Sequence, residues 1–360
     1  MAGDEIADLV AVLPPLLQAL ETLGFVGRHL NPPDLPALIK AIGTPDEALS
    51  AELPRLSKWP ENLEGMRARI ETASTAVLSA YADLRVAPEK RDGVFAAYRA
   101  LGQLTRAQEA LYPLAVGLPP VNRYFLDPET DRNAEMQART LQVTPNPDTG
   151  VFHIKNGDDE RGGFSMYVPE YYTSDREWPL VMALHGGSGN GRGFLWSWLR
   201  TARAYGAILV SPTSTGDTWA LNARDSDTPF LARILDGVTS RWSIDRSRML
   251  MTGMSDGGTF TYMSGLRDSS PFTHLAPISA AFHPLMAQLA GDDGFGGRPI
   301  HIVHGALDWM FPIETARNAR DVLSAARANV TFREIADLSH TYPREVNLSI
   351  LQWMDGQSAE

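Results

Sequence analysis

Apolar residues recur at intervals of three and four positions through the first part of the chain, and charged residues lie between them. This spacing is typical of helices that bury one face in a core. Pro14 and Pro15 interrupt the first stripe, so we expect its helix to break or restart there. We expect further helix boundaries at residues 31–34 and 59–60, where prolines occur. Three stripes carry the prediction: Leu9, Leu13, Leu16, Leu20 and Leu23; Met66, Ile70, Ala73, Val77, Tyr81 and Leu84; and Val94, Tyr98, Leu101, Leu104, Gln108 and Leu111.

A turn-rich segment, residues 144–150, is the expected boundary between this helical region and the rest of the chain. Beyond it, short apolar and β-branched runs alternate with helical stretches, which predicts a mostly parallel, doubly wound α/β sheet. We therefore predict an all-α N-terminal domain or extension over residues 1–145 and an α/β domain over residues 146–360. The predicted strands are 151–154, 164–168, 180–184, 207–210, 249–252, 275–279, 300–303 and 330–335, and the predicted helices between them are 193–205, 229–242, 257–266 and 313–327.

The composition is that of an ordinary folded protein, with 44% hydrophobic and 21% charged residues among 360. The 32 basic and 43 acidic side chains leave a net charge of −11, which disfavours nucleic acid and anionic membrane surfaces as partners. The absence of cysteine excludes disulfides and thiolate nucleophiles. The start of the chain is acidic and its first apolar stretch is interrupted, so we expect no signal peptide, no membrane span and a cytoplasmic location.

Ser255 lies in the sequence GMSDGG, residues 253–258, between a predicted strand and a predicted helix. A G-x-S-x-G turn in this context projects the serine hydroxyl above the sheet, and its glycines allow the strand and the helix to approach each other. The N-terminus of the following helix offers free N–H groups to a developing oxyanion. These features make Ser255 a candidate nucleophile.

Asp308 and His340 each follow a later predicted strand, so we expect both side chains at the same edge of the sheet as Ser255. The order serine, acid, histidine along the chain is that of the nucleophile-elbow hydrolases. His340 would take the proton of Ser255, and Asp308 would orient the imidazole and stabilise the imidazolium. Asp337 is a weaker candidate for the acid because it shares a loop with His340. Among the other histidines, we expect His301 inside a strand, His185 and His304 as organisers of loops, and His283 as a substrate contact.

A glycine-rich loop, HGGSGNG at residues 185–191, directly follows another predicted strand. Its backbone can come close to a substrate oxygen, so we predict that the N–H groups of Gly187 and Asp256 form an oxyanion hole. Glycine-rich loops also bind phosphate, but this loop has neither a Gly-Lys-Ser/Thr ending nor G-x-G-x-x-G spacing. We predict no metal site, because the acidic groups at 158–160 and 292–293 are typical of solvated turns rather than of a calcium-binding loop.

Together these motifs make the second part of the chain resemble an α/β-hydrolase, closest to the esterase branch that contains phospholipase/carboxylesterases and polyhydroxybutyrate depolymerases. The resemblance rests on residues 185–187, 253–258, 304–312 and 339–340. Ser339 departs from the pattern, because the family usually has glycine before the catalytic histidine. The helical region has no counterpart in the minimal family fold. The resemblance implies an α/β-hydrolase catalytic domain with Ser255 as nucleophile, His340 as base, Asp308 as orienting acid, and Gly187 and Asp256 as oxyanion donors.

The predicted function is hydrolysis of carboxylic esters through an acyl-enzyme, without a metal or an organic cofactor. The expected partner is a small-molecule or oligomeric ester, polyesters and aromatic esters included. An amidase or peptidase with the same triad is the alternative among enzymes, and a non-catalytic binding or scaffold protein is the alternative outside them. The helical region is a candidate lid, homo-oligomerisation element or support for the sheet edge. Candidate substrate contacts, placed on loops that follow strands, are Trp219, His283, Trp309, Phe311 and Tyr342.

Overall fold

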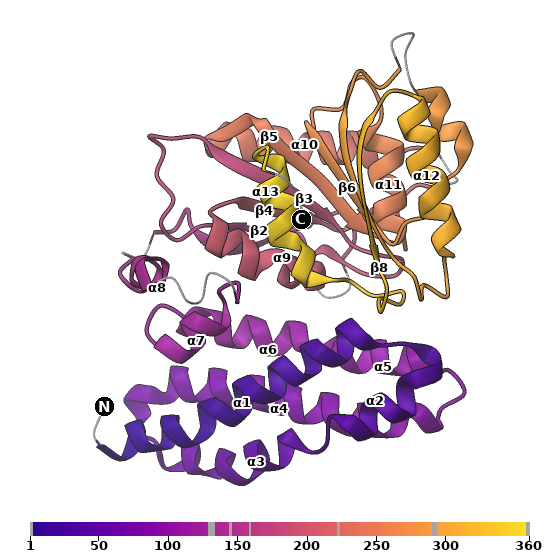
Figure 1. Ribbon diagram of the computed structural model, residues 1–360. Helices are drawn as coiled ribbons and strands as arrows, with labels where there is room; N and C mark the ends of the chain where they lie inside the picture. Colours follow the sequence, from indigo (N-terminus) through magenta and orange to yellow (C-terminus); the bar gives the residue numbers. More distant parts are fainter. Residues whose placement is uncertain are drawn as a thin grey trace. The chain divides into compact units, whose positions relative to one another are not determined.

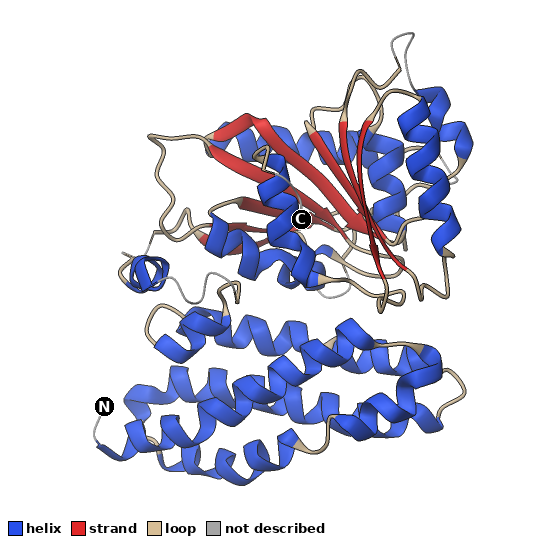
Figure 2. Cartoon of the chain, viewed as in Figure 1, coloured by secondary structure: helices blue, strands red, loops and turns tan. Residues whose placement is uncertain are grey.

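The computed structural model describes residues 3–128, 134–143, 146–157, 160–221, 224–289 and 294–357 of the chain. The chain folds as two compact units, Met1–Val143 and Thr144–Glu360. The first unit is built from helices, and the second holds an eight-stranded sheet with helices on both faces (Figures 1 and 2). Each unit has a buried apolar core of its own.

The helical unit buries two of the apolar stripes that the sequence predicts. The α1 stripe is buried from Leu9 to Leu23, and the α4 stripe from Ile70 to Leu84. The Tyr81 hydroxyl, 3.1 Å from the carbonyl oxygen of Ala19, joins the two helices. The helices of this unit are α1 (Gly3–His29), α2 (Leu35–Ala41), α3 (Pro45–Glu52), α4 (Glu64–Val86), α5 (Gly93–Leu101), α6 (Gln103–Leu111), α7 (Pro119–Tyr124) and α8 (Ala134–Leu141), with short 3-10 helices at Pro32–Asp34, Leu53–Lys58, Glu61–Leu63, Ala87–Glu89 and Tyr112–Leu114.

The expected proline-marked boundaries of this unit are confirmed. The 3-10 helix Pro32–Asp34 separates α1 from α2, and residues 59–60 lie between two further 3-10 helices. The third apolar stripe is not one continuous helix, because Gly102 divides it between α5 and α6.

The expected break at Pro14 and Pro15 is wrong, because α1 runs through both prolines. An interior proline removes one backbone hydrogen bond and crowds the carbonyl four residues earlier, at a cost of about 3 kcal/mol. Pro14 is exposed and Pro15 is half-buried, while Leu13 and Leu16 on either side are buried. The prolines therefore lie toward solvent, where water can bond the freed carbonyl groups. Burial of the leucine face holds the helix together across them.

The segment Asp4–His29 is the one candidate bilayer-spanning helix in the described part of the chain, judged by its length and its mean hydropathy of 1.7. Of its most apolar 18-residue window, 44% is buried inside the unit. A core helix of a water-soluble bundle has the same properties. The absence of a membrane span therefore stays a prediction.

The sheet of the second unit contains all eight strands that the sequence predicts. Its order is β1-β2-β4-β3-β5-β6-β7-β8. The first two pairings, β1 with β2 and β2 with β4, are antiparallel, and all later pairings are parallel. This is the mostly parallel, doubly wound sheet that we predicted. The strands are β1 (Gly150–Ile154), β2 (Phe164–Val168), β3 (Trp178–Leu184), β4 (Ile208–Pro212), β5 (Ile244–Met254), β6 (His274–Ile278), β7 (Pro299–Gly305) and β8 (Asn329–Ile335).

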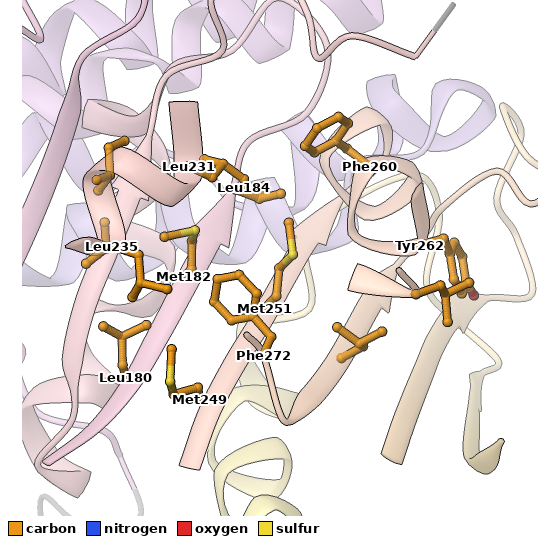
Figure 3. Close-up of a cluster of buried hydrophobic side chains, with 14 of the residues drawn as sticks. Leu180, Met182, Leu184, Leu231, Leu235, Met249, Met251, Phe260, Tyr262 and Phe272 are labelled. Carbon is orange, nitrogen blue, oxygen red and sulfur yellow. The ribbon is translucent and has the colours of Figure 1, made fainter. Parts of the chain in front are cut away.

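Helices cover both faces of the sheet. Figure 1 shows α9 and α13 over one face. On the other face, alternate residues of β3 and β5 meet the apolar sides of α10 and α11 in one core cluster, which also includes residues of α12. Figure 3 shows this cluster, with Met182 and Met251 near Leu235 and Phe260. The helices are α9 (Gly191–Tyr205), α10 (Asp227–Arg241), α11 (Asp256–Gly265), α12 (Ile313–Ala325) and α13 (Asn347–Met354); the sequence predicted the first four but not α13, which spans only 8 residues.

Candidate active site

Ser255 occupies a tight turn between β5 and α11. Its backbone has φ 56° and ψ −120°, a conformation that residues with side chains rarely adopt. Its N–H donates to the carbonyl of Ile278 on the neighbouring strand at 3.0 Å. A Cβ on Gly257 would lie 2.4 Å from the carbonyl oxygens of Leu184 and His185, so only glycine lets α11 approach β3 this closely. The turn is therefore the nucleophile elbow that the sequence predicts.

The structure brings Ser255, Asp308 and His340 together. His340 Nε2 lies 3.0 Å from Ser255 Oγ, and His340 Nδ1 lies 2.9 Å from Asp308 Oδ2. All three residues are buried. The three side chains come from the loops after β5, β7 and β8, which end at the same edge of the parallel part of the sheet. The distances are those over which a proton can pass from hydroxyl to imidazole.

Backbone groups hold the Asp308 carboxylate in place. Its Oδ1 accepts hydrogen bonds from the N–H groups of Met310 and Phe311, at 3.0 and 2.8 Å. His304 Nε2 donates to the carbonyl of Phe311 at 2.8 Å, which restrains the same loop. Burial lowers the pKa of His304, which favours the neutral ring in this position. His304 thus organises the loop that presents Asp308, as we expected. The rival acid, Asp337, is exposed.

Gly187 and Asp256 lie next to each other beside Ser255. A Cβ on Gly187 would be 2.7 Å from Asp256 Oδ2, and a Cβ on Gly186 would be 3.5 Å from Ser255 Cβ. The hydroxyl of Thr218 donates to Asp256 Oδ2 at 2.5 Å. Among the described residues, no acceptor is found for the N–H groups of Gly187 and Asp256. Both groups are thus available to a substrate oxygen at this place.

The predicted substrate contacts differ in how exposed their side chains are. Trp309 is partly exposed and Phe311 is half-buried, and their rings lie 6.4 and 5.3 Å from the His340 ring. His283 is exposed on the segment after β6. Trp219 is buried, stacks on Phe260 and donates its indole N–H to the carbonyl of His185, so it supports the oxyanion loop.

Tyr342 completes this set of candidates. Its hydroxyl donates to Asn347 Oδ1 at 2.8 Å and its ring packs edge-on against Phe194. Burial raises the pKa of Tyr342 well above its usual value, so the hydroxyl stays protonated. That these five residues touch substrate stays a prediction.

Sequence reasoning missed Arg161, a residue that braces the oxyanion loop. Its guanidinium donates to the carbonyls of Gly189 and Gly216 and to the Ser214 hydroxyl, at 2.6, 2.8 and 2.7 Å. Asp227, also missed, is fully buried, and its carboxylate accepts hydrogen bonds from the N–H groups of Thr215 and Ala220 on the loop that follows β4. Both residues lie far from residues 185–189 in the sequence. No local motif marks either residue, since only the fold brings it to the loop.

No cluster of metal-binding side chains occurs among the residues that the structure describes. Of the acidic groups considered from the sequence, residues 158–159 and 292–293 lie outside the described residues. Glu160 is described, and its Oε2 accepts a hydrogen bond from the N–H of Gly157 at 2.7 Å.

A doubly wound sheet that presents a serine on a nucleophile elbow, with a histidine and an acid in hydrogen-bonding line, is the arrangement typical of serine hydrolases with the α/β-hydrolase fold. Comparison with known proteins narrows this class. Residues 229–354 match the phospholipase/carboxylesterase family. The matched residues lie within the second unit, and the helical unit lies outside the matched region.

Individual relatives are distant. A bifunctional acetylxylan esterase/xylanase from Neocallimastix patriciarum is 31% identical over 153 residues, which is 40% of this chain and 21% of that protein. A poly(3-hydroxybutyrate) depolymerase from Ralstonia pickettii is 29% identical over 132 residues, 31% of this chain and 27% of that protein. The chain thus spans about a fifth to a quarter of the length of these curated relatives. Among solved structures, a thermostable esterase is similar at 20% identity, with a TM-score of 0.47, over 59% of this chain and 63% of that one.

Proposed function

We propose that this protein hydrolyses carboxylic esters through an acyl-enzyme formed on Ser255. The observation that carries the proposal is the continuous hydrogen-bonded line from Ser255 Oγ through the His340 ring to the Asp308 carboxylate. Such a line serves nucleophilic catalysis, because a hydroxyl becomes reactive only when a base can take its proton as it attacks.

In the first half-reaction, Ser255 Oγ attacks the ester carbonyl carbon while its proton passes to His340 Nε2. The imidazolium that forms is stabilised by Asp308, whose Oδ2 lies 2.9 Å from His340 Nδ1. The negative charge on the former carbonyl oxygen is received by the N–H groups of Gly187 and Asp256. His340 then gives its proton to the departing alcohol oxygen, which leaves the acyl group on Ser255.

In the second half-reaction, His340 takes a proton from water, and the hydroxide attacks the acyl carbon. Collapse of the second tetrahedral intermediate returns the proton to Ser255 Oγ and releases the acid. All of these steps use side chains and backbone groups of this chain alone.

Apolar and aromatic esters fit the surroundings of the triad best. Leu307, Trp309 and Met310 flank Asp308 in sequence and are 48%, 39% and 43% exposed. Side chains of this kind, next to a reactive centre, favour apolar acyl or alcohol groups. Two relatives are named as an acetylxylan esterase and a poly(3-hydroxybutyrate) depolymerase, which supports including polymeric esters among the candidate substrates.

The test compares wild-type protein with Ser255→Ala on p-nitrophenyl acetate, butyrate and octanoate, on the matching p-nitroanilides, and on hydroxybutyrate oligomers. We expect wild type to hydrolyse the p-nitrophenyl esters, and to hydrolyse the butyrate and the octanoate faster than the acetate. We expect Ser255→Ala to hydrolyse them no faster than buffer does. Circular dichroism of the variant should match wild type, because the replaced hydroxyl is small and α11 stays capped by the same backbone.

A fluorophosphonate probe provides the second readout. Labelling of wild type but not of Ser255→Ala is the expected result. Faster cleavage of anilides than of esters would assign the site to an amidase or peptidase. Folded wild type that neither turns over esters nor takes up the probe would overturn the proposal in favour of a binding or scaffold protein.

A further inference from the structure

The carbonyl of the peptide that joins Gly186 to Gly187 is fixed by two hydrogen bonds. The Gly186 oxygen accepts hydrogen bonds from His185 Nδ1 at 2.6 Å and from the N–H of Gly189 at 3.1 Å. In a trans peptide, the C=O and N–H groups point in opposite directions. The N–H of Gly187 therefore points away from His185. Both glycines lie close to the elbow: a Cβ on Gly186 would lie 3.5 Å from Ser255 Cβ, and a Cβ on Gly187 would lie 2.7 Å from Asp256 Oδ2.

The partners of His185 determine which of its nitrogens carries the proton. The N–H of Ser214 donates to Nε2 at 3.1 Å, so Nε2 must be unprotonated. Nδ1 faces a carbonyl oxygen, so Nδ1 must carry the hydrogen. Burial lowers the pKa of His185 to about 4; the Gly186 carbonyl opposes this shift, Arg161 adds to it and Asp227 opposes it. The ring is therefore neutral near pH 7, as both hydrogen bonds require.

Further contacts restrain the orientation of the His185 ring. Trp219 packs against it with ring centroids 4.9 Å apart and donates to its backbone carbonyl at 2.8 Å. On the loop side, a Cβ on Gly189 would lie 3.2 Å from His185 Nδ1, so the glycine lets the loop fold down onto the ring. Arg161 holds the carbonyl of Gly189. The imidazole thus lies in a close-fitting site below the oxyanion loop.

We propose that His185 is a positioning residue of the oxyanion hole, whose Nδ1–H holds the Gly186–Gly187 peptide in the orientation that presents the Gly187 N–H to the substrate. The proposal rests on the proposed function, since the hole acts only when Ser255 forms a tetrahedral intermediate. Without the bond from Nδ1, the Gly186 carbonyl keeps only the longer bond from the Gly189 N–H, at 3.1 Å. The glycine peptide can then rotate and direct its carbonyl oxygen toward the oxyanion, which converts a favourable contact into a repulsive one.

Two substitutions of His185 test its two ring hydrogen bonds separately, because each variant keeps a different one. In His185→Asn the amide nitrogen lies near the position of Nδ1 and keeps the donor to Gly186. In His185→Gln the amide reaches the position of Nε2 and keeps the acceptor for Ser214 but loses that donor. His301→Gln is the matched control, because His301 is equally buried and lies within β7 instead of beside the oxyanion loop.

We expect kcat for p-nitrophenyl butyrate to stay within about 10-fold of wild type in His185→Asn and to fall about 10²–10³-fold in His185→Gln, with KM within twofold. Affinity for a trifluoromethyl ketone, whose adduct places an oxyanion in the hole, should fall in step with kcat. The His301→Gln control should keep kcat within twofold. Equal kcat in the Asn and Gln variants, or a loss confined to KM, would overturn the proposal.

A measurement on unmodified protein keeps the proposal testable if the variants do not fold. A long-range 1H–15N spectrum of wild type should show His185 as a neutral ring protonated at Nδ1. A ring protonated at Nε2, or a charged ring at pH 7, contradicts the proposal. Failure of the proposed function is distinguishable, because wild type itself would then show neither ester turnover nor probe labelling.

Discussion

Ser255 keeps a backbone conformation that costs about 1–3 kcal/mol. Its neighbours enforce this conformation. The Ser255 N–H is bound to Ile278, and its carbonyl accepts from the N–H of Thr259 at 2.8 Å. The strain is useful because it lifts Oγ out of the sheet toward His340, 3.0 Å away. Residue types and spacing predicted this elbow, since the glycines that permit it are close in sequence.

Asp308→Asn should lower kcat by about 10⁴-fold and leave the fold intact, because an amide cannot stabilise the imidazolium or hold the correct tautomer of His340. Steady-state hydrolysis of p-nitrophenyl butyrate measures the effect. Asp337→Asn is the matched control on the neighbouring loop and should keep kcat within twofold. A large loss in the control together with near-normal rates in Asp308→Asn would transfer the role to Asp337.

Helices and strands could be predicted where the residues that define them are close together in the sequence. All eight strands and the four longer helices of the second unit follow from apolar runs separated by turn residues. α13 was missed because its 8 residues give too few turns to show a periodic pattern. α1 was divided wrongly at Pro14 and Pro15, because the burial that holds its two halves together involves other helices and is not visible in the local sequence.

One buried ion pair joins α9 to the segment after β2. Arg203 Nε lies 2.9 Å from Glu170 Oε1, the Arg203 side chain has no exposed surface, and the hydroxyl of Tyr167 also donates to Glu170. Glu170→Gln should lower the free energy of unfolding by about 3–5 kcal/mol, because it removes the carboxylate charge that faces the buried Arg203 guanidinium. The double variant Glu170→Gln with Arg203→Met should recover much of that loss. Urea denaturation measures both; a loss below about 1 kcal/mol in the single variant would show that the pair contributes little.

For the molecule as a whole, stability should depend on pH through buried neutral histidines. Burial lowers the pKa of His185 and of His301 to about 4 in the folded protein, while both are near 6.5 in the unfolded chain. The unfolded chain therefore binds more protons between these values. Stability is complete above about pH 6.5 and falls as the pH drops toward 4.

At pH 5 each of these two histidines should cost on the order of 2 kcal/mol relative to pH 8. Within the described structure, both ring nitrogens of His301 lack a hydrogen-bond partner, so His301→Phe removes a titrating group without breaking a bond. Urea midpoints measured from pH 8 to pH 5 should fall for wild type and fall less for His301→Phe. Parallel slopes for the two proteins would contradict this explanation.

The amino-acid sequence alone was enough to determine the order of the serine, the aspartate and the histidine along the chain, the turn that holds Ser255 and the alternation of strands with helices. Each of these is encoded by residues near one another, where spacing decides which face of a helix or strand is buried. Only the tertiary structure decided that Arg161 braces the oxyanion loop, that Trp219 lies beneath it and that the His185 ring must carry its proton on Nδ1. These contacts join loops far apart along the chain, and their geometry follows from sheet register and crossover packing, which local periodicity does not encode.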